Sequence, residues 1–236
     1  KNLDIYPIKC GTYQKKGYDI ILKMSLDDHM SKLDLSGKSD EKSDSFTYSV
    51  LQDPIKALNI IYPSKKIEDI QYNERGHINI TKTNIDFIGD SGLKRFMNYE
   101  QSEKPYKRYN FNYNDNNDVK KYGRIFSPKK IGLYSSKIKN ICEKVNKYDG
   151  ISIIYSQYIS SGVLPMALAL EEIGFKRHGD VPSLLHADYI RENNIEEVDA
   201  ITNLKKSDFK KKHPKKNFNK SSYVIISGDI YYSPQN

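Results

Sequence analysis

Apolar side chains recur at regular spacing mainly in the second half of the chain. Residues 135–147 place them at positions i, i+3, i+4 and i+7, which predicts an amphipathic helix with a serine N-cap. Residues 163–173 are nearly all apolar, with a proline in the first turn and Gly174 at the end, and predict a buried helix. The runs ISIIY at 151–155 and YVIIS at 223–227 are typical of buried parallel strands.

These segments follow one another as strand, helix and strand, which predicts a βαβ unit. The fold class that follows is α/β with a parallel sheet. The interval at about 176–222 is longer than a crossover needs, and it predicts an insertion.

The first half of the chain gives weaker patterns. Residues 12–24 and 49–62 predict helices, and Pro54 suits the first turn of the second one. Residues 31–45 and roughly 99–122 are dense in Ser, Asp, Asn and Lys. Because such segments bury little apolar surface, we expect both to be polar loops.

The composition is basic and polar. Lys and Arg number 38 against 30 Asp and Glu, so the formal net charge is +8, which suits a nucleic-acid partner. Mean hydropathy is −0.72, and no segment approaches the roughly 18 apolar residues of a membrane span, so we expect an intracellular protein with no membrane partner. The cysteines, Cys10 and Cys142, cannot form a disulfide framework, and Cys142 falls on an apolar helix face, which predicts a core position. The five histidines lack metal-ligand spacing, so no metal site is expected.

Two polar loops follow the predicted strands, SQYISSG at 156–162 and SGD at 227–229. If the strands are parallel, both loops meet at one sheet edge, where ligands bind in open α/β folds. Backbone N–H groups at a helix start also suit phosphate oxygens. A plain strand-to-helix turn remains the alternative for the first loop.

Eight lysines gather at 205–220, with Phe209 and Phe218 among them. Such a cluster suits the phosphate backbone of a nucleic acid, and the alternative is a solvated loop in a lysine-rich chain. The chain has no G-x-x-x-x-G-K-[ST] loop, no G-x-G-x-x-G fingerprint and no G-x-S-x-G elbow. A phosphate cradle for ATP is therefore not encoded here, and no catalytic residue is assigned.

The segment 150–176, GISIIYSQYISSGVLPMALALEEIGFK, resembles the start of the second RecA-like lobe of superfamily 2 helicases. The resemblance is to the ATP-dependent helicases of nucleocytoplasmic large DNA viruses, which are mimivirus-, asfarvirus- and poxvirus-like. It covers most of the chain and is most specific at 122–176. Further segments fit the same family in the same order: CGTYQKKGY at 10–18, ALNIIYP at 57–63, YGRIFSPKKIGLYSS at 122–136 and YVIISGD at 223–229.

The resemblance implies three parts of the chain: 1–24 leads into the second lobe, 25–132 is a family-specific spacer, and 133–236 is an incomplete RecA-like lobe with helical and polar insertions. The candidate nucleic-acid contacts are Tyr155, Ser156, Gln157, Tyr158, Ser161, Gly162, Ser227, Gly228 and Asp229. The lysine cluster adds five candidate backbone contacts: Lys210, Lys211, Lys212, Lys215 and Lys216.

The expected parent is a viral ATP-dependent helicase or nucleic-acid-dependent NTPase, a hydrolase that binds ATP and Mg. Both chain ends look cut, so we expect a fragment that is inactive alone. The expected partners are DNA or RNA, the first helicase lobe of the same chain and viral transcription machinery, in the virion or the host cytoplasm (viral factory). Two alternatives stay open: a non-enzymatic nucleic-acid-binding or transcription-complex subunit, and a doubly wound enzyme that binds a phosphorylated small molecule.

Overall fold

The computed structural model describes residues 4–36, 43–73, 85–103, 108–148, 150–179 and 181–233. Its α-helices are α1 (Thr12–Ser36), α2 (Ser43–Asn59), α3 (Lys65–Glu68), α4 (Gly89–Phe96), α5 (Asn117–Tyr122), α6 (Ile131–Tyr134), α7 (Ser136–Lys147), α8 (Leu164–Ile173), α9 (Ala187–Glu192) and α10 (Lys206–Lys212). A π-helical turn, η1 (Ile159–Val163), leads directly into α8. The strands are β1 (Met97–Ser102), β2 (Arg108–Tyr113), β3 (Lys176–Arg177) and β4 (Ser222–Tyr223). The chain therefore mixes helices and strands, as predicted.

The described strands form two separate pairs and no larger sheet. β1 and β2 are antiparallel, from Met97 opposite Tyr113 to Ser102 opposite Arg108. β3 and β4 are parallel over two residues each. Because β3 follows α8, this short parallel pair does not involve the run at 151–155.

The described structure does not form the two buried parallel strands predicted at 151–155 and 223–227. The first run lies outside any strand, and Ile151 and Ile153 are 98% and 92% exposed. In the second run only Tyr223 belongs to a strand, and Ile226 is 90% exposed. A strand is stable only where a neighbour supplies hydrogen-bond partners, and the described chain offers neither run such a neighbour along its length.

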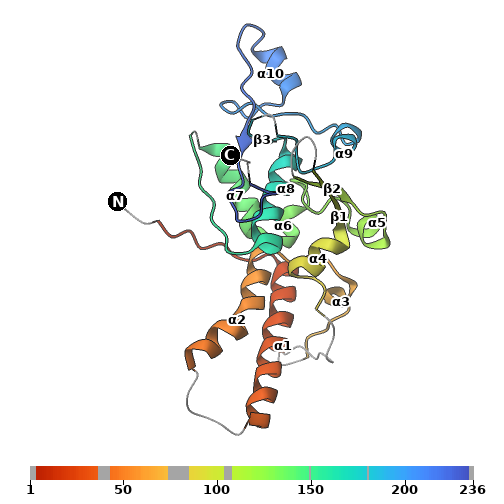
Figure 1. The fold of residues 1–236 in the computed structure, drawn as a ribbon, viewed down its shortest axis with the longest axis vertical. Coiled ribbons are helices and arrows are strands. Elements are labelled where there is room, and N and C mark those ends of the chain that lie inside the picture. Colours follow the sequence, from red (N-terminus) through yellow and green to blue (C-terminus); the bar gives the residue numbers. More distant parts are fainter. Residues whose placement is uncertain are drawn as a thin grey trace.

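The N-terminal helices α1 and α2 form an arm that projects from the rest of the fold (Figure 1). The loop predicted at 31–45 is wrong for 31–36 and 43–45, which are helical, while 37–42 lie outside the described residues. Helix α2 begins before the predicted start and ends at Asn59, so Pro54 lies inside it. No helix in the described ranges is both long and apolar enough to cross a lipid bilayer.

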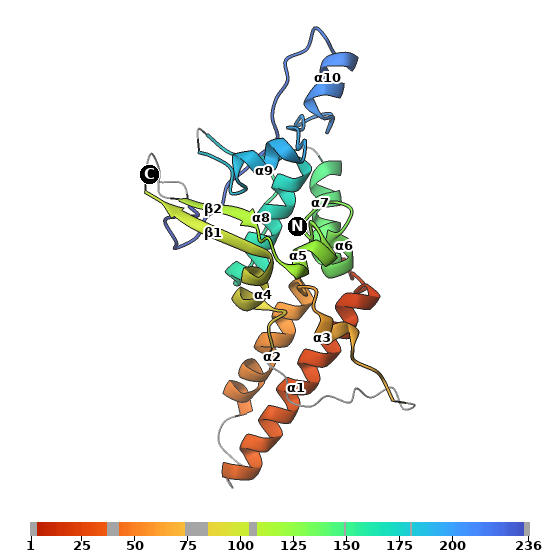
Figure 2. The ribbon, with the colours of Figure 1, turned by 90° about the vertical axis from the view of Figure 1, so that its right-hand side faces the viewer.

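The polar stretch predicted as a loop at 99–122 is not a loop in its described parts, 99–103 and 108–122, while 104–107 lie outside the described residues. It holds most of the β1–β2 hairpin, which Figure 2 shows beside α8, and the helix α5. Side chains alternate along β2, so that Phe111 is fully buried between the polar neighbours Asn110 and Asn112. The N–H of Phe111 donates to the carbonyl of Leu184 at 2.6 Å, which ties the hairpin to the second half of the chain.

One apolar core joins the two halves of the molecule. It packs Ile60, Phe96 and Phe126 together with Leu168 and Ile225. A smaller cluster lies where α1 meets the segment after α2. The boundary predicted near residue 133 is therefore not a packing boundary, although the assignment of the parts to a helicase stays a prediction.

Helices α7 and α8 confirm the clearest patterns in the sequence. The Ser135 hydroxyl accepts the N–H of Ile138 at 3.0 Å and caps α7, as predicted. Gly174 ends α8 in the left-handed conformation with φ 117°. Cys142 is buried in the core, as predicted, and burial raises the pKa of its thiol to about 12.

Candidate nucleic-acid interface

The loop at 156–162 is a compact turn that precedes α8. The N–H of Val163 donates to the carbonyl of Tyr158 at 3.0 Å and closes the π-helical turn. The Ser156 hydroxyl accepts the N–H of Tyr158 at 3.2 Å. A Cβ atom on Gly162 would collide with the Ser156 hydroxyl, so the loop folds back on itself only because residue 162 is glycine.

Three contacts fasten this loop to the first half of the chain. The N–H of Gly89, at the start of α4, donates to the Ser161 hydroxyl at 2.9 Å. The buried hydroxyl of Tyr62 donates to the carbonyl of Ser160 at 2.6 Å. The Ser160 hydroxyl donates to the carboxylate of Asp90 at 3.4 Å. The loop is therefore held in one position by α4 and by the chain after α2.

The predicted contacts in this loop differ in their access to solvent. Tyr155 is 88% exposed and Gln157 is also exposed. Ser156 and Tyr158 are half-buried, whereas Ser161 and Gly162 are buried. In this structure the two buried residues position the loop, and the exposed pair is the part that is open to solvent.

The second predicted loop, 227–229, is a turn closed by serine side chains. The N–H of Ser227 donates to the Ser233 hydroxyl at 2.7 Å, and the N–H of Asp229 donates to the Ser227 hydroxyl at 3.2 Å. The hydroxyl of Tyr109 lies 3.5 Å from the Asp229 carboxylate. Gly228 is exposed, and the other two residues of the motif are half-buried.

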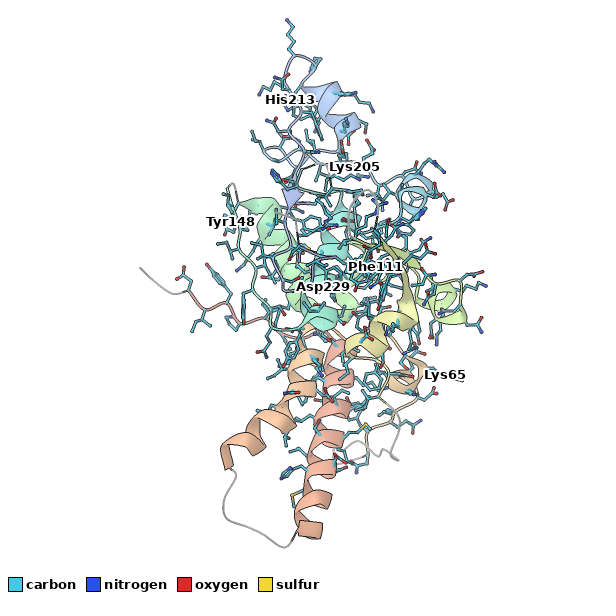
Figure 3. The ribbon with its side chains drawn as sticks, in the orientation of Figure 1. Lys65, Phe111, Tyr148, Lys205, His213 and Asp229 are labelled. Carbon is cyan, nitrogen blue, oxygen red and sulfur yellow. The ribbon has the colours of Figure 1, made fainter. Side chains whose placement is uncertain are left out.

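Tyr232 lies next to the second loop, since its N–H donates to the carbonyl of Asp229 at 3.1 Å. Burial raises the pKa of this tyrosine, and the negative charges of Asp229 and Asp90 raise it further. Asp90 also holds Ser160 of the first loop, and Asp229 lies in the middle of the fold (Figure 3). In the described structure no sheet edge lies between the two predicted loops, so they do not meet there as predicted.

The lysine cluster lies elsewhere, in a projecting unit of residues 205–220 that we call the basic knob. It contains α10, and Lys205 and His213 mark it in Figure 3. The knob is attached through Val198, whose N–H donates to the carbonyl of Gly174 at 3.3 Å. Gly174 ends α8, whereas the 156–162 loop precedes α8. The five predicted backbone lysines are all exposed: Lys210, Lys211, Lys212, Lys215 and Lys216.

Two buried glutamates on α8 were not predicted from the sequence. Glu171 accepts the N–H groups of Leu184 and Leu185 at 2.7 Å each, and the Tyr223 hydroxyl at 2.6 Å. Burial raises the pKa of Glu171 in spite of these donors. The available signal was the acidic pair itself, which interrupts the apolar helix at 163–173.

The neighbouring Glu172 binds a second set of donors. It pairs with Arg124 and accepts the hydroxyls of Tyr189 at 2.5 Å and Tyr113 at 3.2 Å. Arg124 also donates to the side-chain oxygen of Asn193 at 3.1 Å. The glutamates thus lock α8 to β2, α9 and β4, which makes the helix a rigid support for the loop before it and the knob behind it.

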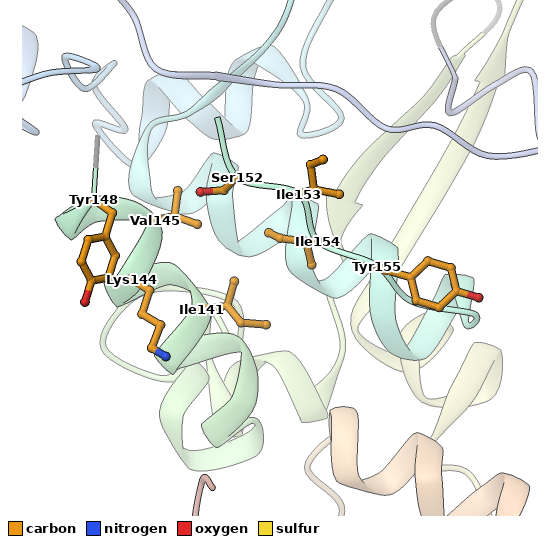
Figure 4. A pocket seen from close by; sticks show the side chains of 8 residues that line it. All are labelled: Ile141, Lys144, Val145, Tyr148, Ser152, Ile153, Ile154 and Tyr155. Carbon is orange, nitrogen blue, oxygen red and sulfur yellow. The ribbon is translucent and has the colours of Figure 1, made fainter. Parts of the chain in front are cut away.

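A shallow groove of about 340 Å³ lies between α7 and the extended run at 151–155 (Figure 4). Ile154 points toward Ile141 and Val145 on α7, whereas Tyr155 points away from them. Lys144 is the charged side chain among the lining residues. One isoleucine therefore holds the run against α7, and the groove offers no cluster of polar groups for a small ligand.

The binding of ATP and Mg by the parent remains a prediction. Within the described ranges, no group of three or more His, Cys, Asp or Glu side chains gathers where it would hold a metal ion. The sequence also lacks a phosphate loop. Comparisons with protein-family models, with curated proteins and with solved structures found no match to this chain.

Proposed function

We propose that the chain is part of the second RecA-like lobe of a viral superfamily 2 helicase or nucleic-acid-dependent NTPase. Its loops at 155–158 and 227–229 contact the backbone of DNA or RNA. The observation that carries this proposal is the exposure of Tyr155 and Gln157 on a loop that Tyr62 and Gly89 hold in place. The proposed family, lobe and ATP-dependent activity rest on the resemblance of the segment 150–176 to superfamily 2 helicases.

The finer proposal for the fold is a parallel sheet in which 151–155 and 223–227 are central strands. Both runs are β-branched and apolar, yet they expose Ile151, Ile153 and Ile226 almost completely. Apolar runs of this kind are normally covered on both faces in parallel sheets. Their exposure supports a sheet that is completed by other strands of the parent.

In the parent, ATP and Mg would be held together with the first lobe, and their hydrolysis would drive the movement of the two lobes. The residues of this chain hold the nucleic acid. A tyrosine ring stacks on any base, and amide and hydroxyl groups bind phosphate oxygens without reading sequence. The rigid attachment of α8 keeps these groups in place during movement. Viral transcription machinery is the proposed partner complex, in the virion or the viral factory of the host cytoplasm.

The test is binding of fluorescent single-stranded DNA and RNA, measured by anisotropy. Tyr155→Ala with Gln157→Ala is expected to weaken binding about tenfold, because aromatic stacking contributes ~1–3 kcal/mol per base. The matched control is Tyr72→Ala with Gln71→Ala, an exposed pair of the same residue types far along the chain, which leaves binding unchanged. Equal effects of the two variants would refute the assigned surface.

A further inference from the structure

We propose that the basic knob, residues 205–220, is a second nucleic-acid backbone contact that folds as its own unit at the opposite end of α8 from the 155–158 loop. The inference rests on the proposed function only for the class of partner. It places the knob at a separate position along the nucleic-acid strand, where lysine side chains bind phosphates and no aromatic ring stacks on a base.

The knob is folded around a small aromatic centre. Phe209 is buried, and its ring lies 5.3 Å from the His213 ring and 5.4 Å from the Phe218 ring. Asp199 holds the chain together at the two ends of the knob. Its carboxylate accepts the N–H groups of Asn219 and Thr202 at 2.9 Å each. The lysines are therefore presented from a defined shape, which decides against a loosely solvated loop.

The charge of the knob is available for a partner. Within the described ranges, none of the five lysines of the last α10 turn and the following loop forms an ion pair. Two nearby carboxylates bind other groups: Glu197 pairs with Lys206 at 2.9 Å, and Glu196 accepts the N–H of Ser207 at 3.0 Å. Asp208, in the first turn of α10, is the acidic residue within the knob. With eight lysines and one aspartate, residues 205–220 therefore carry a large excess of positive charge.

The chemistry of the surface favours phosphate over an acidic protein. Protein interfaces depend on apolar or aromatic anchors at their centre. In the knob, Phe209 is buried and Phe218 is half-buried against it. What remains on the outside is a set of flexible ammonium groups, which suits the uniform charge of a nucleic-acid backbone.

The knob and the loop are separated by the length of α8. A helix of ten residues is ~15 Å long, and α10 lies beyond its end (Figure 1), so the two places are more than ~15 Å apart. A strand must exceed this length to reach both places at once. Simultaneous contact raises the apparent affinity, since the second contact forms within the first complex.

The experiment uses the full chain with oligothymidylates of four and twenty nucleotides over a range of salt concentrations. In the knob variant, Lys210, Lys211, Lys212, Lys215 and Lys216 are all changed to Gln. We expect it to weaken binding of the long strand more than tenfold and to lower the salt slope by up to about 3.5, at ~0.7 per lost phosphate contact. The short strand is affected much less. The matched control changes five exposed lysines elsewhere to Gln, namely Lys9, Lys65, Lys120, Lys129 and Lys147, and it retains most of the affinity.

Two further measurements separate the possible failures. Phe209→Ala keeps every lysine but removes the aromatic centre, and it should weaken binding of the long strand severalfold; unchanged binding would refute the folded unit. Polyglutamate that competes as well as the long oligothymidylate would refute the choice of nucleic acid. A knob variant that binds as well as its control overturns the inference. Unchanged binding by the variant with Tyr155→Ala and Gln157→Ala overturns the proposed function but not the role of the knob.

Discussion

The pair formed by Arg124 and Glu172 offers the sharpest test of how the fold is held together. The Glu172 side chain is fully buried, whereas the Arg124 side chain is 34% exposed. Arg124→Met keeps the aliphatic stem but leaves a buried carboxylate with only two tyrosine donors. Removing one partner of a buried pair costs ~3–5 kcal/mol, and the partial exposure of this one places the expected loss at about 3 kcal/mol.

The reciprocal change should cost less. Glu172→Gln removes the buried charge, and water can solvate the guanidinium that remains, so we expect a loss of about 1 kcal/mol. The double variant should be more stable than Arg124→Met alone, because it no longer buries an unpaired charge. The wild type, the two single variants and the double variant form a double-mutant cycle. We expect it to give a coupling energy between Arg124 and Glu172 of about 1–2 kcal/mol.

Urea unfolding followed by circular dichroism gives the free energies. The control is Arg191→Met, which removes an exposed pair with Asp188 and should change stability by less than about 0.5 kcal/mol. An Arg124→Met variant as stable as this control, or a double variant no more stable than Arg124→Met, would contradict the buried network.

Three other outcomes follow from single positions. Gly174→Ala should lower the unfolding free energy by more than about 2 kcal/mol, because φ is 117° and a Cβ would collide with the carbonyl of Glu196; urea midpoints check this. Burial raises the pKa of Glu171, so its protonated form stabilises the folded state at low pH and this contribution fades as pH rises through that raised pKa. The stability advantage of the wild type over Glu171→Gln should therefore shrink from about pH 4 upward, in urea titrations at each pH. Iodoacetamide should label the partly exposed Cys10 first, and the buried Cys142, with a pKa of about 12, only after unfolding, as read by mass spectrometry.

The elements that the sequence predicted well are those that local rules determine. The α7 cap at Ser135 and the α8 stop at Gly174 depend on residues within one turn of the helix end. Strands depend on partners far along the chain, so the β-branched run at 151–155 was predicted as a strand that the described structure does not form. The hairpin was missed because its Asn and Lys content suggested a loop, although Tyr109 and Phe111 alternate with polar residues at the spacing of a strand.

The candidate site was predicted in outline only. The sequence located the 156–162 loop correctly before a helix, but it gave no sign that Ser161 would be buried under the N–H of Gly89. That contact joins residues 72 positions apart, and no local pattern encodes it. The position of the knob beyond the end of α8 was not predicted for the same reason. It depends on a contact between residues far apart in the sequence, the hydrogen bond from the N–H of Val198 to the carbonyl of Gly174.

The exposed runs at 151–155 and 223–227 also bear on how this chain behaves at high concentration. Apolar β-branched runs with exposed isoleucines are templates for intermolecular cross-β pairing. Neither run contains a charged side chain or a proline that would hinder stacking of copies. Aggregation of this polypeptide would therefore begin at Ile151, Ile153 and Ile226, and a lysine at one of these positions would act as a gatekeeper without disturbing the core.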